Sequence, residues 1–559
     1  MKEVIKAALQ AVLTKLGLPE ANFTIEHPAD LSHGDYACNV AMVLGKQVGQ
    51  APRTVAEQIQ EALQGQIEYV AKIEIAGPGF LNFYLSRDFF AAEIARANDL
   101  EGEWGSNHSL AEETVLVEYT SPNLFKPLHI GNLVGNIIGE SLTRLFECGG
   151  ADVKRLNYPS DIGPVVAKAV WGLRQTGGSA NDILALGEAY RVGSEAYDND
   201  EAPKAEIDTI NQTLYAGTDT ELNEVRIAGI NTSRESLATI CAKLGTSFDA
   251  EIFESEVGSV GVEVVKKNLG SIFIESDGAL VYPGEQVGLH TRVFVNSKGL
   301  PTYEAKDLGN FTKKNELFPN WSTSLVVTGN EQTEYFKVLF AALREVFAIP
   351  QNKNLEHIGT GFLTLTTGKM SSRKGNVLTG EALLEEIEAE ARVKAAETRT
   401  DNLDELTEQV AVAALKYQIL RQATGQNIIF DKEQALSFEG DSGPYLQYTH
   451  ARIGSVLKKA EAEGLVGSID LAPELPYEIE RLIYQFPEVV AKALVERAPH
   501  KVTGFITELA SAFNTFYASE KIADAADTYA PYKIALATAV KNTLKNGLWV
   551  LGIKAPEQM

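Results

Sequence analysis

A mostly apolar strand that runs through a short polar loop into a helix occurs twice in this chain. Residues 114–119 have the pattern of a buried strand, a Ser-Pro-Asn loop follows, and residues 128–148 have helical spacing. The same order returns in residues 325–328, a Gly-Asn turn and residues 331–347. Strands that alternate with helices build parallel sheets covered by helices. The sequence therefore predicts a Rossmann-type, nucleotide-binding α/β domain.

The regions around this pattern differ in character. Residues 1–110 alternate helical and strand-like patterns and predict an N-terminal α+β domain. Residues 111–385 carry the α/β pattern, interrupted at about 175–265 by an acidic, mostly helical insertion. Residues 386–559 have helical spacing and predict a C-terminal all-α helical bundle. We expect three domains, and the length of the chain by itself suggests three or four.

Charge and cysteine content exclude several classes of protein. The formal net charge of −25 opposes unspecific binding to nucleic acid, although local basic patches can still hold one. No apolar run approaches the roughly 20 residues of a membrane helix, and residues 1–18 have amphipathic spacing rather than that of a signal peptide. Cys38, Cys148 and Cys241 lie far apart, which suggests neither a zinc site nor disulfides. We expect a cytoplasmic protein with no membrane contact and no structural zinc.

The loop after the first strand has the sequence Ser-Pro-Asn-Leu-Phe-Lys-Pro-Leu-His-Ile-Gly-Asn (residues 121–132). A helix N-terminus offers free N–H groups and the positive end of a dipole, which suit a phosphate. Lys126 and His129 would add donors there, and Gly131 would let a nucleotide approach the backbone. Taken alone, the segment is equally compatible with a helix start capped by a histidine.

A second polar segment follows a strand-like stretch at residues 356–365. Its sequence is Gly-Lys-Met-Ser-Ser-Arg-Lys-Gly-Asn (residues 368–376), with Lys369, Arg373 and Lys374 close together. Cations on such a loop can stabilise the charge that develops on a departing pyrophosphate. The alternative is a basic loop in solvent.

Together, the two segments resemble the HIGH and KMSKS signatures of class I aminoacyl-tRNA synthetases. Ser-Pro-Asn-x-x-Lys-Pro-x-His-x-Gly is similar to the arginyl-tRNA synthetase form of the first signature. Residues 33–37 and 76–82 resemble that family's additional tRNA-binding domain. Residues 443–452 resemble its helical anticodon-binding domain. The resemblance covers nearly the whole chain.

The resemblance implies a complete reaction. The enzyme would attach L-arginine to tRNA(Arg) through an arginyl-adenylate, using ATP with Mg²⁺ and releasing pyrophosphate and AMP. It would act as a monomer and would need tRNA before it activates arginine. No metal site of its own is implied.

The resemblance also assigns residues to ATP, with two departures. Asn132 replaces the second histidine of HIGH, and Ser372 stands where KMSKS has its second lysine. An amide donates hydrogen bonds but carries no charge. Lys126, just before the first signature, is expected to supply the missing charge. The expected catalytic residues are Lys126, His129, Lys369 and Lys374, and the expected ATP-binding residues are His129, Gly131, Asn132, Met370 and Lys369.

Recognition of arginine requires acceptors arranged around a flat, permanently charged fork. Glu118 ends the first strand, at the edge where α/β sheets bind ligands. Tyr303 and Asp307 lie four apart on a predicted helix at 301–311 and share a face. A solvated helix face is the alternative for that pair. The resemblance assigns arginine binding to Glu118, Asn123, Tyr303, Asp307 and Gln332.

Contacts to tRNA are expected from aromatic, amide and Arg side chains, which suit unstacked bases. The resemblance points to Phe80 and Asn82 in the N-terminal domain and to Tyr445, Tyr448 and Arg452 in the C-terminal one. For Tyr445 and Tyr448, a place in the core of the bundle is the alternative.

Three other functions compete with this interpretation. A cysteinyl or glutamyl synthetase is the nearest, but the first needs cysteine ligands for zinc and the second lacks the Ser-Pro-Asn-x-x-Lys-Pro pattern. A small nucleotidyltransferase shares both signatures but lacks a long helical C-terminal region. A non-catalytic tRNA-binding protein would have no reason to keep His129, Lys369 and the Tyr303/Asp307 pair.

Overall fold

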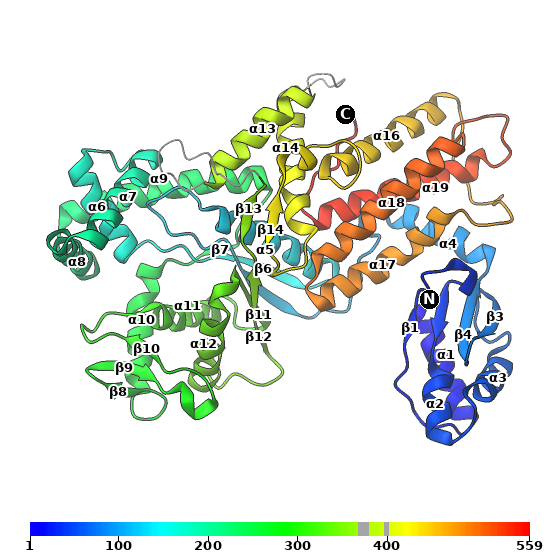
Figure 1. Ribbon diagram of the computed structural model, residues 1–559, viewed down its shortest axis with the longest axis horizontal. Coiled ribbons are helices and arrows are strands. Elements are labelled where there is room, and N and C mark those ends of the chain that lie inside the picture. The colour runs from blue at the N-terminus through cyan, green and yellow to red at the C-terminus, as the bar shows by residue number, and fades with distance from the viewer. Residues whose placement is uncertain (367–378, 396–401) are drawn as a thin grey trace. The chain divides into compact units, whose positions relative to one another are not determined.

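The computed structural model describes residues 1–366, 379–395 and 402–559 (Figure 1). The described chain divides into two compact units. The first contains Met1–Trp104, Ile453–Phe486 and Ser511–Thr543. The second contains Gly105–Arg452, Pro487–Ala510 and Leu544–Met559. The sequence segments that form a unit are therefore not contiguous along the chain.

A five-stranded parallel sheet occupies the centre of the second unit, in the order β12-β11-β5-β6-β7. Each pair of neighbours runs parallel. The strands are β5 (Thr114–Glu118), β6 (Asp152–Asn157), β7 (Ala250–Glu251), β11 (Trp321–Gly329) and β12 (Asn354–Thr360). The predicted parallel α/β fold is confirmed.

Both predicted strand–loop–helix units are present. Helix α5 (Ile130–Cys148) follows β5, and α12 (Thr333–Val346) follows β11 after a short 3₁₀ turn, η4 (Asn330–Gln332). Most of α5 is buried, because the sheet covers one side and other helices of the unit cover the other. Its N-terminus therefore has a fixed position beside the end of β5.

The acidic insertion forms α7 (Ile183–Asn199), α8 (Glu201–Ala216) and α9 (Thr220–Leu244), with α10 (Glu254–Lys267) at its end. Together with α6 (Pro164–Thr176), α7 to α9 enclose an apolar core that also contains Leu124 and Phe125 from the first signature segment. A side chain at Gly229 in α9 would collide with the ring of Phe125, at 2.4 Å. The insertion therefore supports the loop that carries the signature.

A small antiparallel sheet precedes α11 (Tyr303–Leu317). Its strands are β8 (Ile274–Ser276), β9 (Ala279–Tyr282) and β10 (Arg292–Val295), and they lie near α10 to α12 (Figure 1). Phe273, Tyr282 and Phe294 share one core with residues of α11 and α12. This core sets the position of α11 relative to the main sheet.

The strand expected at 356–365 is two strands. β12 ends at Thr360, and β13 (Leu363–Leu365) pairs instead with β14 (Ile428–Phe430), in a parallel register. A Cβ atom at Gly361 would lie 2.0 Å from the carbonyl oxygen of Gln426, so only glycine permits this crossing. β14 is a short strand within a stretch expected to be helical throughout.

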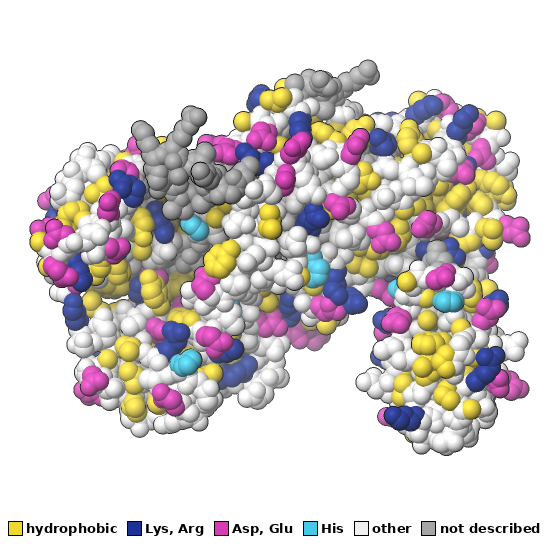
Figure 2. Space-filling view, viewed as in Figure 1, with side chains coloured by type: hydrophobic (Ala, Val, Ile, Leu, Met, Phe, Trp, Pro, Cys, Tyr) yellow, Lys and Arg dark blue, Asp and Glu magenta, His cyan; other side chains and the backbone are white. Residues whose placement is uncertain are grey.

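Helices dominate the remainder of the described chain. They are α13 (Gly380–Ala395), α14 (Leu403–Leu420), α15 (Lys432–Ala435), α16 (Gly443–Ala462), α17 (Glu478–Glu496), α18 (Pro499–Ser519) and α19 (Ala530–Val550). Within the described residues, we find no helix that combines the length and apolar character needed to cross a membrane. In Figure 2, acidic and basic side chains are interspersed over both units.

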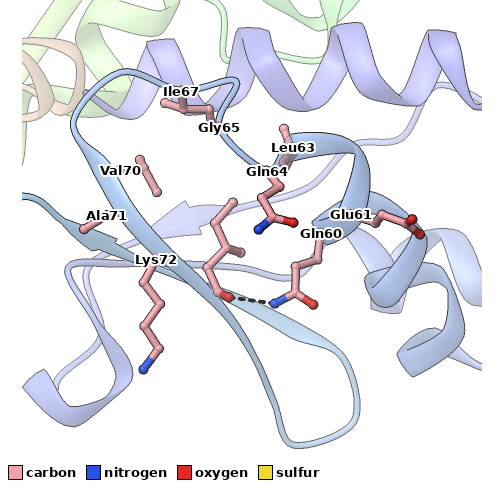
Figure 3. A pocket seen from close by; sticks show the side chains of 10 residues that line it. Gln60, Glu61, Leu63, Gln64, Gly65, Ile67, Val70, Ala71 and Lys72 are labelled. Carbon is pink, nitrogen blue, oxygen red and sulfur yellow. Dashed lines mark hydrogen bonds between the residues drawn. The ribbon is translucent and has the colours of Figure 1, made fainter.

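In the first unit, four antiparallel strands form a sheet in the order β1-β2-β4-β3. The strands are β1 (Ile25–Glu26), β2 (Tyr36–Cys38), β3 (Val70–Ala76) and β4 (Phe80–Leu85), and the helices nearby are α1 (Lys2–Lys15), α2 (Val40–Val48), α3 (Pro52–Leu63) and α4 (Arg87–Leu100). A polar cavity of about 400 Å³ lies between the end of α3 and the edge strand β3 (Figure 3). The amide of Gln60 crosses it and donates to the carbonyl oxygen of Ile73 at 2.6 Å.

Buried ion pairs join the segments of the first unit. Arg87 holds both oxygens of Glu480, at 2.6 and 3.1 Å, and the hydroxyl of Tyr532 donates to the same carboxylate at 2.7 Å. Arg481 donates to the buried carboxylate of Asp35 at 2.9 Å. Residues about 400 positions apart in the sequence therefore depend on one another for charge compensation.

Candidate active site

Several of the predicted residues lie at the carboxyl edge of the parallel sheet. β5 ends at Glu118, β6 ends just before Tyr158, and β11 ends just before η4, which contains Gln332. Because the strands are parallel, these three ends meet on one side of the sheet. Helix α11 contributes Tyr303 and Asp307 from its first two turns.

The loop between β5 and α5 has an unusual backbone. Thr120, Ser121 and Phe125 have positive φ angles of 73°, 37° and 67°, which cost free energy for residues other than glycine. The side-chain amide of Asn132 donates to the carbonyl oxygen of Thr120 at 2.8 Å, and the N–H of Phe125 donates to Ser233 Oγ at 2.9 Å. In this structure, the amide donor of Asn132 therefore stabilises the loop.

His129 is the N-cap of α5. Its Nδ1 atom accepts a hydrogen bond from the N–H of Gly131 at 3.1 Å, so the ring proton resides on Nε2. Burial, and secondarily the charge of Lys126, lower the pKa of His129, which favours the neutral ring. A Cβ atom at residue 131 would lie 3.2 Å from Nδ1, which explains the glycine. The site thus presents an N–H donor beside the positive end of a helix.

Lys126 lies over an aromatic ring. Its Nζ atom is 5.0 Å from the ring centre of Tyr190 in α7, a cation–π contact. Within the described part of the chain, no carboxylate forms an ion pair with Lys126. Its charge is therefore available to an anionic ligand.

The second signature lies outside the described residues, and with it Lys369, Met370, Ser372 and Lys374. The chain that follows it is described. Thr379 forms an antiparallel bridge with His129, and the N–H of Gly380 donates to the carbonyl oxygen of Leu128 at 2.8 Å. The described chain after the second signature is therefore paired with the first signature.

Asp307 is a partly buried carboxylate in α11 that accepts a hydrogen bond from the hydroxyl of Tyr335 in α12. Loss of hydration raises the pKa of Asp307 to about 8; the bond from Tyr335 opposes this rise, and the charge of Glu118 adds to it. Tyr303, one turn earlier, is 56% exposed. Since the carboxylate is desolvated, the sequence-based alternative of a solvated helix face does not describe Asp307.

The two neighbouring carboxylates each have a lysine. Glu118 pairs with Lys314 at 2.7 Å and accepts from the amide of Asn310 at 2.9 Å. Glu254 pairs with Lys306 at 2.5 Å. Among the described residues, Asp307 has no comparable cation. Among the described residues, the cluster thus contains one carboxylate without an ion-pair partner of its own, which is the arrangement a cationic ligand requires.

The remaining residues expected to bind arginine or tRNA lie in several places. Asn123 forms a backbone bridge with Ser160 near the sheet edge, and Gln332 is exposed at the start of α12. On α16, the guanidinium of Arg452 stacks over the ring of Tyr448 at 4.7 Å; Tyr448 is exposed and Tyr445 is partly buried. On β4, Phe80 is partly buried and Asn82 is buried.

Sequence reasoning missed several members of the carboxylate cluster: Tyr158, Glu254, Lys306, Lys314 and Tyr335. One signal was present for Tyr158, which directly follows a strand at the ligand-binding edge. The lysines and Tyr335 come from helices whose register against the sheet the sequence pattern does not fix.

The described residues contain no group of three or more His, Cys, Asp or Glu side chains placed to hold a metal ion. The geometry instead combines a donor-rich helix start with a desolvated, partly uncompensated acidic cluster. Such a site suits one ligand that carries phosphates and another that carries a cation.

Three family models match the chain. Residues 97–432 match tRNA synthetases class I (R), catalytic domain; residues 446–559 match the DALR anticodon binding domain; residues 1–85 match the arginyl tRNA synthetase N terminal domain. The arginine–tRNA ligase of Clostridioides difficile is 31% identical, over all of this chain and 99% of that protein. That of Lactococcus lactis is 30% identical over the full length of both.

Solved structures agree on the fold. The Thermus thermophilus arginyl-tRNA synthetase superposes with a TM-score of 0.81, at 24% identity and over the full length of both chains. The Plasmodium falciparum arginyl-tRNA synthetase gives 0.80, at 21% identity, over 100% of this chain and 99% of that one. On the match of the catalytic model to more than half of the chain, this protein belongs to the arginyl-tRNA synthetase family of class I aminoacyl-tRNA synthetases.

Proposed function

We propose that this protein is an arginine–tRNA ligase that joins L-arginine to tRNA(Arg) through an arginyl-adenylate. In the first step, the arginine carboxylate attacks the α-phosphate of ATP and pyrophosphate leaves. In the second, a ribose hydroxyl at the end of the tRNA attacks the acyl carbon and AMP leaves. Family membership supports the overall reaction, and the geometry of the site supports the choice of amino acid.

One observation carries the assignment to arginine: the carboxylate of Asp307 lacks a cation while both of its acidic neighbours have one. A guanidinium brings a permanent charge and a planar set of N–H donors that match a carboxylate. Tyr303, Asn123 and Gln332 would contribute further polar contacts, and Glu118 would act beside Asp307. A neutral amino acid would leave the carboxylate of Asp307 without a cation.

For the ATP phosphates, His129 would donate from Nε2, and the N-terminus of α5 would add its dipole. Lys126 would supply a full charge, and Lys369 and Lys374 are assigned a similar part from their motif. Gly131, Asn132 and Met370 would complete the nucleotide site. Mg²⁺ enters with ATP as part of the substrate. The arginine carboxylate is already a nucleophile, so orientation and electrostatic stabilisation suffice for catalysis.

The tRNA would contact both units. Phe80 and Asn82 are assigned to one part of the tRNA, and Tyr445, Tyr448 and Arg452 to the anticodon stem-loop, where the stacked Arg452–Tyr448 pair offers a platform for a base. We also propose that the protein acts as a cytoplasmic monomer. Binding should weaken steeply with salt.

A charging assay with all twenty amino acids and bulk tRNA tests the proposal. Only arginine should become attached to tRNA, with one AMP released for each arginine. ATP–pyrophosphate exchange, run with and without tRNA, then shows whether activation itself requires tRNA. Attachment of a different amino acid, or no attachment at all, would overturn the assignment.

A further inference from the structure

Asp307 alone cannot accept every hydrogen bond that a guanidinium offers. A guanidinium carries five N–H donors, and one oxygen of Asp307 already accepts from Tyr335. We infer that two tyrosines outside both signatures complete the socket around Asp307: Tyr335 holds its carboxylate in position, and Tyr158 accepts a hydrogen bond from the guanidinium. This inference rests on the proposed function.

Tyr335 is well placed to orient a carboxylate. Its ring packs edge-on against Phe336, with centroids 5.1 Å apart, and lies under the guanidinium of Arg292 at 5.2 Å. Arg292 is in turn fixed by Glu304, at 3.0 Å. These two contacts restrict the ring, and its hydroxyl donates to Asp307. The bond to Oδ2 leaves Oδ1 of Asp307 open to the substrate.

The hydrogen bond from Tyr335 also acts on the charge of Asp307. The groups that face this carboxylate are Tyr335 from α12, Glu118 from β5, Lys314 from its own helix, Glu254 from α10 and Tyr158 after β6. Burial raises the pKa of Tyr335 well above its usual range, so its hydroxyl stays protonated and donates. Its bond lowers the pKa of Asp307 against the effect of desolvation, and so favours the carboxylate that binds a cation.

Tyr158 offers a buried hydroxyl that could accept a hydrogen bond from the ligand. Its hydroxyl oxygen is shielded from solvent and has no hydrogen-bond partner among the described residues. The charges that act on it most are those of Asp307, Glu254 and Glu118, which places it within the same acidic cluster. Its backbone N–H donates to Ser121 Oγ at 3.3 Å, which anchors it to the signature loop. A buried hydroxyl without a partner is costly, and a guanidinium N–H would satisfy it.

The two tyrosines favour one class of ligand. A planar cation with donors on several edges can meet Asp307 and Tyr158 at once, whereas the compact ammonium of lysine presents its donors from a single atom. The pair therefore contributes to selection of a guanidino group over an amino group. Neither position is part of a sequence signature, so family motifs alone would not identify them.

The test of Tyr335 is the pH profile of kcat/KM for arginine in tRNA charging, measured for the full chain. In the wild type, kcat/KM should rise with pH as Asp307 ionises, with an apparent pKa near 8. In Tyr335→Phe the ascending limb should move up by about one pH unit, giving an about tenfold loss at pH 7 and an about twofold loss at pH 9. A structural defect alone would scale the whole profile by one factor.

Tyr282→Phe is the matched control. The hydroxyl of Tyr282 donates to Glu345, in the same helix as Tyr335, at 2.6 Å, but it does not face Asp307. Its pH profile should coincide with that of the wild type. A Tyr335→Phe profile that is unshifted or uniformly lowered would overturn the positioning role. A wild-type kcat/KM that does not change with pH would also overturn this role, and this can be measured even if Tyr335→Phe fails to fold.

Tyr158→Phe should produce two opposite effects. The arginine KM should rise by about tenfold, because one acceptor is lost. The thermal midpoint without arginine should be unchanged or higher, because an unsatisfied hydroxyl is removed. A lower midpoint, or an unchanged KM, would overturn the role of Tyr158. A wild type that does not charge arginine refutes the proposed function itself, whereas an active wild type with unaffected variants refutes only this inference.

Discussion

At the scale of single residues, the proposed arginine site centres on the carboxylate of Asp307. Desolvation raises its pKa to about 8, so near neutral pH most of the free enzyme holds it protonated. A guanidinium would bind the ionised form and draw the equilibrium toward it. Asp307 thus lowers the stability of the folded protein without ligand, and it favours binding once a cationic ligand is present.

Asp307→Asn separates these two effects. The arginine KM should rise by at least about a hundredfold, since loss of a buried ionic partner costs about 3–5 kcal/mol, while the ATP KM stays within a few-fold. Because the folded pKa lies above the unfolded value, Asp307 reduces stability as pH rises from about 4 to about 8. The variant should therefore be more stable than the wild type at pH 8 and similar at pH 4. Steady-state kinetics and thermal unfolding at both pH values measure this.

Lys126→Ala tests the charge assigned to the ATP site. Activation of arginine should fall by about a hundredfold, as when one electrostatic contact to the transition state is lost, with a small change in arginine KM. Lys313→Ala removes an exposed lysine that pairs with Glu316 and is the control. Near wild-type exchange rates in Lys126→Ala would contradict the assignment.

From the sequence alone, we could predict the residues that belong to recognisable motifs. His129, Lys126 and Asp307 lie where the motif and the helix periodicity suggested, at the end of β5 and on one face of α11. Lys314 and Tyr335 were not predicted, because they meet the cluster through the register of α11 and α12, which depends on core packing across several elements. Local patterns carry no information on that register.

At the scale of elements, close packing of α10 on α11 positions the cluster. A Cβ atom at Gly261 would lie 1.7 Å from the carbonyl oxygen of Ala305, and one at Gly309 would lie 2.0 Å from that of Val257. The two backbones therefore approach as only glycines allow. This approach brings Glu254 of α10 to Lys306 of α11, next to Asp307.

Gly309→Ala should force these helices apart. We expect a loss of stability of about 1–3 kcal/mol, as in other overpacked interiors, and an arginine KM that rises more than the ATP KM. Gly504→Ala is the control, because a methyl group there has no atom within 4 Å and alanine favours a helix. Equal effects on both substrates would show that α10 and α11 do not specifically position the arginine site.

The secondary structure of the α/β region was largely predictable, because strands buried on both faces and amphipathic helices have distinct periods. The division of residues 356–365 into β12 and β13 was not. It depends on Gly361 approaching Gln426, a contact between segments 65 residues apart. β14 was missed for the same reason, since its three residues form a strand only by pairing with β13.

At the scale of the whole molecule, the first unit depends on buried charge pairs between distant segments. Glu480 is buried, and desolvation raises its pKa while Arg87 lowers it. The ion pair has little contact with solvent, so its loss is not buffered by water as it would be on the surface.

Arg87→Met should destabilise the first unit by about 3–5 kcal/mol. Without Arg87 the folded pKa of Glu480 rises further above the unfolded value, so the loss should be least near pH 4 and should grow as the pH rises. The double variant Arg87→Met/Glu480→Gln should recover much of the lost stability. Arg53→Met, which breaks an exposed pair, should change stability by less than about 0.5 kcal/mol. Thermal unfolding across pH checks all three.

The discontinuous make-up of the first unit also sets an order of events during translation. Residues 1–104 leave the ribosome before the segments that contain the partners of Arg87 and Asp35, the last of which ends at Thr543. At about 5–20 residues per second, the nascent N-terminal domain waits roughly 20–90 seconds for them. During that interval Asp35 and Arg87 lack these counter-charges, so the ribosome-bound segment is less stable than the same segment in the completed first unit.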